Sequence, residues 1–269
     1  MRRAALLCAL AILAAASPAR SHDRWDLGTL DDDDGPTNNP NELPYGGSQI
    51  HDLEATGSPP DEDWIQVRVR DGHSYEARAS GTSGIYWSAV GGPVCQVGFC
   101  ASLARVDAVG TILQGASQLE GSSRAVSVRW IAAAAGGALL RVTGPNGTAM
   151  GTSDEYVFEF FDTTYAAPRF NNSASQTTVL IIQNLTVVGV TGNIDFYSAA
   201  GNLLHSEPLT LNARATSVVN TAALPGLAGQ SGSVLVAHTG GWGALAGKAV
   251  ALEPATGFTF DTPLVAATR

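Results

Sequence analysis

Residues 64–80 read WIQVRVRDGHSYEARAS, and this stretch decides the fold class. Apolar and polar side chains alternate from 64 to 70 and again from 74 to 80, with Asp71-Gly72 between the two runs. Strict alternation is the pattern of a strand with one buried face, and Asp-Gly is a turn dipeptide that joins neighbouring strands. The stretch therefore predicts a β-hairpin.

The same pattern continues along the chain. Alternating or continuous apolar runs, separated by turn residues, include RAVSVRWIA (124–132), EYVFEFFDT (155–163), TTVLIIQNL (177–185) and GSVLVAHT (232–239). Many short strands with turns between them predict antiparallel sandwiches, and the length suits two modules. The sequence therefore predicts an all-β protein with one sandwich at 43–164 and a second at 165–269.

The N-terminus predicts export. Arg2 and Arg3 precede an unbroken apolar run at 4–16, and Ser17-Pro18-Ala19 supplies small residues for cleavage. This is the layout of a secretory signal peptide, here residues 1–19, and the run is too short to span a membrane. We expect a secreted mature protein with no membrane span. It begins with an acidic, Asn- and Pro-containing leader at 20–42.

Composition narrows the function classes. The formal net charge is −9, hydrophobic residues make up 45% of the chain, and charged residues make up only 14%. An acidic chain has no surplus positive charge with which to displace counterions from phosphates, so no nucleic-acid partner is expected. The hydrophobic content is enough for a core, which argues against a disordered protein.

Two cysteines remain after removal of the signal peptide, Cys95 and Cys100. An even pair in an exported protein predicts a local disulfide that holds a turn. The alternative is a redox or metal pair, but the usual two-residue spacing and any nearby third ligand are missing.

Acidic clusters raise the hypothesis of a calcium site. Four consecutive carboxylates, Asp31 to Asp34, precede Gly35, and Asp61, Glu62 and Asp63 precede the first strong strand. Calcium binds six to eight oxygens in a flexible shell, so Asp32, Asp34, Asp61 and Asp63 are the candidate ligands. The alternative is a solvated, self-repelling acidic tail.

Three aromatic residues are candidates for ligand binding. Tyr86 and Trp87 lie near a Gly-rich stretch, and Trp242 lies within HTGGWGAL (238–245). A tryptophan among glycines has little local scaffold to bury it, so Trp242 is the strongest of the three. The alternative is that it folds back and closes one end of the sandwich.

A family resemblance comes from residues 41–80. The segment DEDW (61–64), which opens one strand, and GHSYE (72–76), which opens the next, resemble the bacterial pre-peptidase C-terminal domain, as do SSRAVSVRW (122–130) and YVFEFFDTT (156–164). The resemblance implies a jelly-roll-like sandwich in a secreted bacterial protein, in a family where some related modules bind collagen, polysaccharide or calcium. Members of the family usually accompany a peptidase or another hydrolase, whereas here we expect the module to follow only a signal peptide and a leader. The second half is similar to immunoglobulin-like accessory modules of bacterial exoproteins.

No catalytic constellation stands out. The segments GTSGI (81–85) and GQSGS (229–233) lack the last glycine of a nucleophile elbow, and no histidine pair has metal-ligand spacing. The sequence therefore favours a secreted, non-catalytic accessory protein that binds an extracellular protein or polysaccharide. The alternatives are a hydrolase with an unrecognised active site and a structural or adhesion protein of the cell surface.

Overall fold

The computed structural model describes residues 41–53, 62–81, 86–87, 100–119, 124–144, 155–173 and 175–267. Within these ranges nearly all regular structure is strand, and the short 3₁₀ helix η1 (Thr221–Ala223) is the exception. No helix in this part of the chain is long and apolar enough to cross a membrane. The predicted all-β sandwich fold is confirmed.

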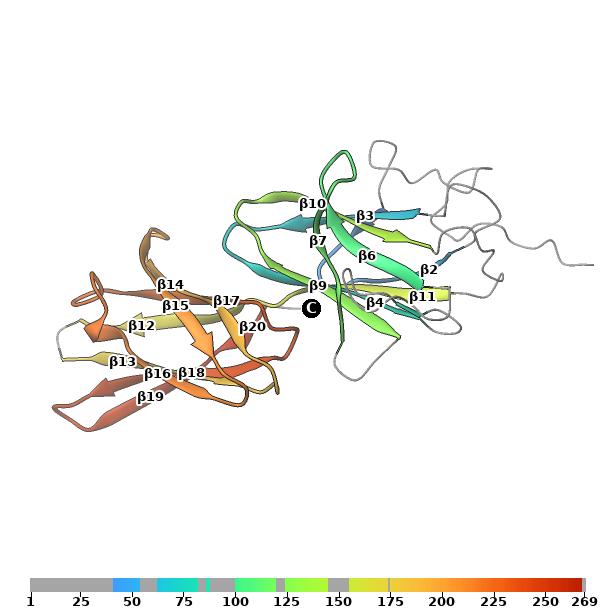
Figure 1. Cartoon of the computed structure of the whole chain (residues 1–269). Helices are drawn as coiled ribbons and strands as arrows, with labels where there is room; N and C mark the ends of the chain where they lie inside the picture. The colour runs from blue at the N-terminus through green and yellow to red at the C-terminus, as the bar shows by residue number, and fades with distance from the viewer. Residues whose placement is uncertain are drawn as a thin grey trace, which may run out of the picture.

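The strands up to β11 form two sheets that face each other (Figure 1). One sheet has the order β1 (Asn41–Leu43), β3 (Glu62–Val69), β10 (Gly136–Thr143), β6 (Cys100–Val106) and β5 (Tyr86–Trp87), with β7 (Ile112–Gly115) also on β6. The other has the order β2 (Ser48–Asp52), β11 (Glu155–Asp162), β4 (Ser74–Gly81), β9 (Ala125–Ile131) and β8 (Ser117–Gln118). The pairs β1–β3 and β5–β6 are parallel, whereas the sequence pattern predicts antiparallel pairing.

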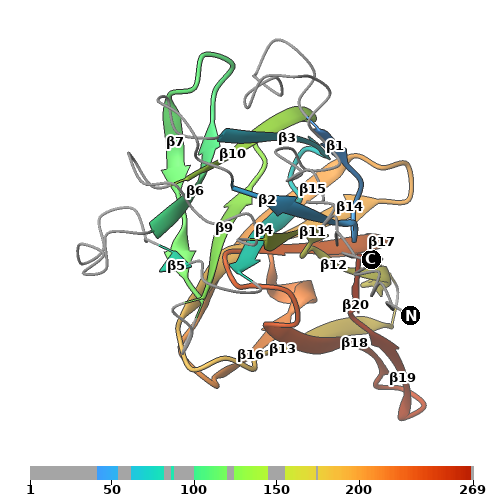
Figure 2. The same ribbon diagram turned by 90° about the vertical axis from the view of Figure 1, so that its right-hand side faces the viewer.

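The later strands form a second pair of sheets, seen from another side in Figure 2. The first of these has the order β15 (Leu203–Leu211), β14 (Val190–Ser198), β17 (Ser231–His238), β12 (Tyr165–Asn171) and β20 (Val265–Ala266). The second has the order β16 (Thr216–Asn220), β13 (Thr177–Asn184), β18 (Leu245–Glu253) and β19 (Phe258–Pro263).

Each pair of sheets encloses its own core. The larger buried side chains of the first core include Tyr75, Trp87, Tyr156, Phe158 and Phe160, and those of the second include Phe170, Ile194 and Phe196. Burial alternates along the strands because successive side chains point to opposite faces of a sheet. In β13, for example, Thr178, Leu180 and Ile182 are buried while their neighbours are not.

The hairpin predicted for residues 64–80 is wrong. Both strands exist, but β3 pairs with β1 and β10, whereas β4 pairs with β11 and β9 in the opposite sheet. The turn at Asp71-Gly72 therefore carries the chain from one sheet to the other. Gly72 has a φ of +70° and donates its N–H to the Ala132 carbonyl at 2.9 Å, which fixes this corner. The alternating pattern shows which face of a strand is buried, but it does not show which other strand it pairs with.

The chain passes from the first pair of sheets to the second between Asp162 and Tyr165. Here Thr163 donates its N–H to the Ser74 carbonyl at 2.8 Å, and Ser74 donates its N–H to Thr164 Oγ1 at 2.9 Å. All three residues are buried. The connection is thus hydrogen-bonded to β4, the strand that carries Glu76, and lies inside the protein.

Candidate functional site

A buried carboxylate, Glu76 on β4, lies where the two sandwiches meet. Its side chain is fully buried and accepts hydrogen bonds from Arg129 Nε on β9 and from Arg78 Nη2, both at 2.8 Å. A buried carboxylate is tolerated only when it is paired and hydrogen-bonded. Burial by itself would raise the pKa of Glu76, but the two arginines and a backbone N–H outweigh it and hold the pKa below its usual value.

That backbone N–H belongs to the second sandwich. Trp242, in the loop between β17 and β18, donates its N–H to Glu76 Oε2 at 2.9 Å, and its ring stacks on Phe161 of β11 with centroids 5.7 Å apart. The neighbouring Gly241 shows why this loop has a glycine next to the carboxylate. A Cβ at Gly241 would lie 2.9 Å from Glu76 Oε1, so any larger residue would push the loop off the carboxylate.

A cleft of about 630 Å³ opens beside this cluster, between the two sandwiches. Its walls carry Arg78 and Arg129 from the first sandwich and Trp242 from the second. Polar and apolar residues complete the lining: Gln118, Leu119, Leu185, Thr186, Val188, Gly189, Thr239, Gly240, Gly241, Gly243 and Ala244.

The cleft is positively charged although the protein is acidic. Two guanidinium groups face one carboxylate in the cluster, and among the described residues no carboxylate lines the cleft. The surplus is therefore one positive charge. Each arginine side chain keeps a little over a quarter of its surface exposed, so both can meet a ligand without leaving Glu76. Arginine suits a planar acid group because it can donate two parallel hydrogen bonds.

His238, at the end of β17, contacts the loop that carries Trp242. Its side chain is fully buried, its Nδ1 accepts the Gly240 N–H at 3.1 Å, and its ring packs against Tyr165. Because Nδ1 is the acceptor, the neutral ring carries its hydrogen on Nε2. Burial lowers the pKa of His238 to about 4, against the opposing effects of the Thr163 backbone and the Glu76 charge.

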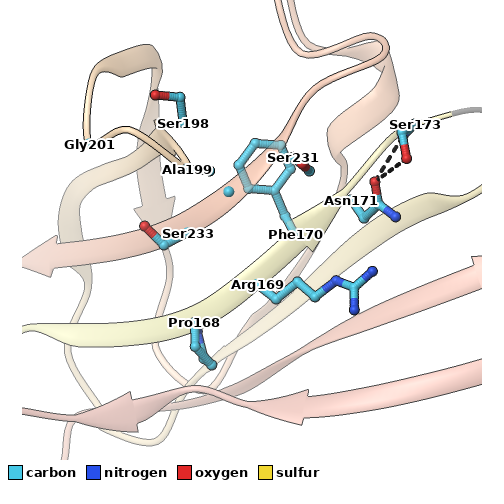
Figure 3. A pocket seen from close by; sticks show the side chains of 11 residues that line it. Pro168, Arg169, Phe170, Asn171, Ser173, Ser198, Ala199, Gly201, Ser231 and Ser233 are labelled. Carbon is cyan, nitrogen blue, oxygen red and sulfur yellow. Dashed lines mark hydrogen bonds between the residues drawn. The ribbon is translucent and has the colours of Figure 1, made fainter.

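A second cavity of about 620 Å³ lies in the second sandwich (Figure 3). It lies at the ends of β12, β14 and β17 that are farther from the cleft. A shift in the β12–β17 register between Ala167 and Phe170 accompanies it. Its lining is rich in hydroxyl groups, with Ser173, Ser198, Ser231 and Ser233 beside Arg169. Figure 3 shows Ser173 hydrogen-bonded to Asn171, with both bonds on Asn171 Oδ1. Among the described residues that line it, the one aromatic side chain, Phe170, is buried in the core.

The aromatic residues predicted to bind ligand lie in different places. Trp242 lies in the lining of the cleft, half-buried, and its ring stacks on Phe161 of the first sandwich. Its role in ligand binding stays a prediction. Trp87 is 2% exposed and packs edge-on against Tyr156 in the first core, so it presents no surface to a ligand. Tyr86 precedes it in β5, and its side chain lies outside the described residues.

Of the predicted calcium ligands, only Asp63 lies in the described part of the chain; Asp32, Asp34 and Asp61 lie outside it. Asp63 is buried and accepts the Tyr156 hydroxyl hydrogen bond at 2.6 Å, and its other oxygen is 3.3 Å from His51 Nδ1. No cluster of three His, Cys, Asp or Glu side chains within the described ranges is placed to hold a metal. The calcium site stays a prediction.

Asp63→Asn should lower the free energy of unfolding by about 2 kcal/mol, because the asparagine oxygen can still accept the Tyr156 hydroxyl but without a charge, and the ion pair with His51 is lost. The loss should be the same in chelator and in millimolar calcium if Asp63 acts through Tyr156 and His51 and not through calcium. Urea unfolding in both buffers measures it. The control is Glu42→Gln, whose partner Arg68 is mostly exposed and which should change stability by less than about 1 kcal/mol. Equal effects of the two variants would contradict the assigned role of Asp63.

The disulfide also stays a prediction, because Cys95 lies outside the described residues. Cys100 opens β6.

Comparisons with known proteins add little to this geometry. No family model and no curated protein matches the chain. Among solved structures it is similar to a β-glucuronidase from glycoside hydrolase family 2, with 9% identity over 93% of this chain and a TM-score of 0.20. The chain spans only 29% of that structure's chain. A likeness of this size assigns neither a family nor an activity to the protein.

Proposed function

We propose that the protein is a secreted, non-catalytic binding protein, and that its site is the cleft between the two sandwiches. Its ligand is a saccharide that carries an acid group. The observation that supports this most is the cleft wall, where Arg78 and Arg129 lie beside Trp242. Within the described ranges its lining contains no carboxylate.

The cleft is favoured over the hydroxyl-rich cavity for two reasons. Binding sites occur preferentially where domains meet, and both sandwiches contribute to this one. It also combines an aromatic ring, paired cations and apolar residues, whereas the other cavity offers one arginine among small hydroxyls. An aromatic ring can lie against the apolar face of a sugar, while hydroxyl and amide groups such as Thr186 and Gln118 can bond its edge.

The overall charge limits the ligand to few acid groups. With a net charge of −9, the protein repels a polyanion at long range. At physiological salt this repulsion fades beyond about 8 Å, so a short ligand with one or two acid groups can reach the arginines. The cluster has one positive charge to spare, which matches a single acid group.

The test compares acidic oligosaccharides with neutral ones of the same length by titration calorimetry. We expect binding of an acidic member that weakens as salt is raised, with no hydrolysis of the sugar. Val188→Asp should reduce the affinity about tenfold, which corresponds to about 1.4 kcal/mol, because it adds a negative charge at the cleft rim. Val188 is 52% exposed, so the substitution leaves the core intact.

The matched control is Val218→Asp on β16, which adds the same charge at an exposed site outside the cleft. It should leave the affinity unchanged. Equal binding of acidic and neutral sugars, or equal effects of the two variants, would remove the cleft from consideration. Hydrolysis of any probe would show an enzyme instead.

A further inference from the structure

The strand β19 is an edge of the second sandwich. Among the described strands it pairs with β18 on one side and with none on the other, and Figures 1 and 2 both show it at the periphery of the protein. Two large apolar side chains of this strand, Phe258 and Phe260, are 66% and 62% exposed. Proteins usually protect a free edge with charge, a bulge or a proline, because it can pair with another strand.

The β18–β19 hydrogen-bond pattern shows which backbone groups of β19 point to its open side. Leu264 donates its N–H to the Gly247 carbonyl at 2.9 Å, which continues the β18–β19 register. Because antiparallel ladders alternate, Phe260 directs its backbone toward β18, whereas its neighbours Thr259 and Asp261 direct theirs outward. Pro263 also faces outward but has no N–H, so it ends the available edge.

This edge is complementary to itself. If two copies of the segment 259–261 run antiparallel across a twofold axis at Phe260, Thr259 of each copy faces Asp261 of the other. Both residues then exchange N–H and carbonyl bonds, which gives four bonds in all. Phe260 meets its own counterpart at the position where cross-strand side chains are closest, and aromatic pairs there are favourable.

The neighbouring charges fit the same arrangement. Asp261 would lie near its symmetry mate, but Lys248 holds each carboxylate at 2.6 Å and neutralises it. Phe260 also borders a cavity of about 430 Å³, lined in part by Ala251 and Thr178, which a second phenylalanine at the axis would help to cover. A self-complementary patch around a twofold axis is the usual basis of a homodimer.

We propose that the protein forms a symmetric homodimer through β19, with one continuous sheet across both copies and Phe260 on the twofold axis. The partner that fits this edge is therefore a second copy of the chain.

The first test is the mass of the protein in solution, measured by sedimentation from about 1 µM to about 1 mM, the range in which a short edge contact would saturate. We expect a monomer–dimer equilibrium. Phe260→Lys should weaken it at least tenfold, because two like charges would meet on the axis. Thr259→Pro should do the same, because it removes an outward N–H and leaves the β18 ladder intact. Thermal melts of both variants show that the fold is kept.

Two controls separate this edge from others. Val218→Lys places the same charge on β16, the opposite edge of the same sheet, and should leave the dimer intact. Phe260→Cys should form a disulfide-linked dimer on mild oxidation, because residues facing across such a pair lie within disulfide range, whereas Val218→Cys should not. A monomer at every concentration overturns the proposal. So does a dimer that survives Phe260→Lys and Thr259→Pro, or one that Val218→Lys dissociates.

Discussion

Glu76→Gln will lower the free energy of unfolding by about 3–5 kcal/mol, the usual cost of removing one partner from a buried ion pair. The carboxylate is fully buried and is the common partner of two arginines and of the loop that carries Trp242. Without its charge, Arg78 and Arg129 lose the carboxylate that both of them pair with. Urea unfolding at pH 7 measures the loss.

The control is Glu42→Gln, whose partner Arg68 is mostly exposed, and it should cost less than about 1 kcal/mol. Gly241→Ala tests the same contact from the other sandwich, since its Cβ would press on the carboxylate. It should lower stability by about 1–3 kcal/mol, the range for overpacking. If Glu76→Gln costs no more than Glu42→Gln, the cluster does not stabilise the join.

The second large effect is acid sensitivity from His238. Its pKa in the folded protein is about 4, below the ordinary value of 6.5, because burial disfavours the charged ring. Below pH 6.5 the unfolded chain therefore binds a proton that the folded protein does not. Stability is complete above pH 6.5 and falls as the pH drops toward 4, by about 3 kcal/mol in all.

His238→Asn isolates this effect, because the asparagine oxygen can still accept the Gly240 N–H but the side chain does not titrate. We expect the wild type to lose about 3 kcal/mol of stability relative to the variant between pH 7 and pH 4. Above pH 7 the two profiles should run parallel. Parallel profiles over the whole range would mean that His238 keeps its ordinary pKa in the folded protein. The low pKa of Glu76 adds a separate loss below about pH 4.5, in both proteins.

The sequence was sufficient to predict the strands but not their neighbours. Residues 64–80 alternate as strands do, yet the two strands enter different sheets, because a turn that reverses the chain can join strands within one sheet or between two. Trp64 illustrates a related limit. It begins a strand with a buried face, but it packs with Ala104 and Val106 in a small cluster apart from the main core, beneath Arg141.

The candidate site was half predictable. Trp242 stands out among glycines, and it does line the cleft. Glu76 does not stand out, because alternation places it on the polar face of its strand, where a charged residue needs no explanation. It is buried only because a loop 166 residues away covers it. A glycine pair before the tryptophan was the available signal, since such glycines mark a close approach of the backbone.

The crossing at Asp71-Gly72 has a consequence for how quickly the protein reaches its native state. Because β3 and β4 do not pair with each other, neither can complete its ladder from local contacts. Strand β3 needs β10 in place, and strand β4 needs β11. Among the described strands, the adjacent pairs of the first sandwich are short, β6 with β7 and β8 with β9. The adjacent pairs of the later sandwich, β14 with β15 and β18 with β19, are longer and can form from their own turns. Non-local pairing slows folding because loop entropy is lost before contacts form. The half made first at the ribosome should therefore be the slower to fold.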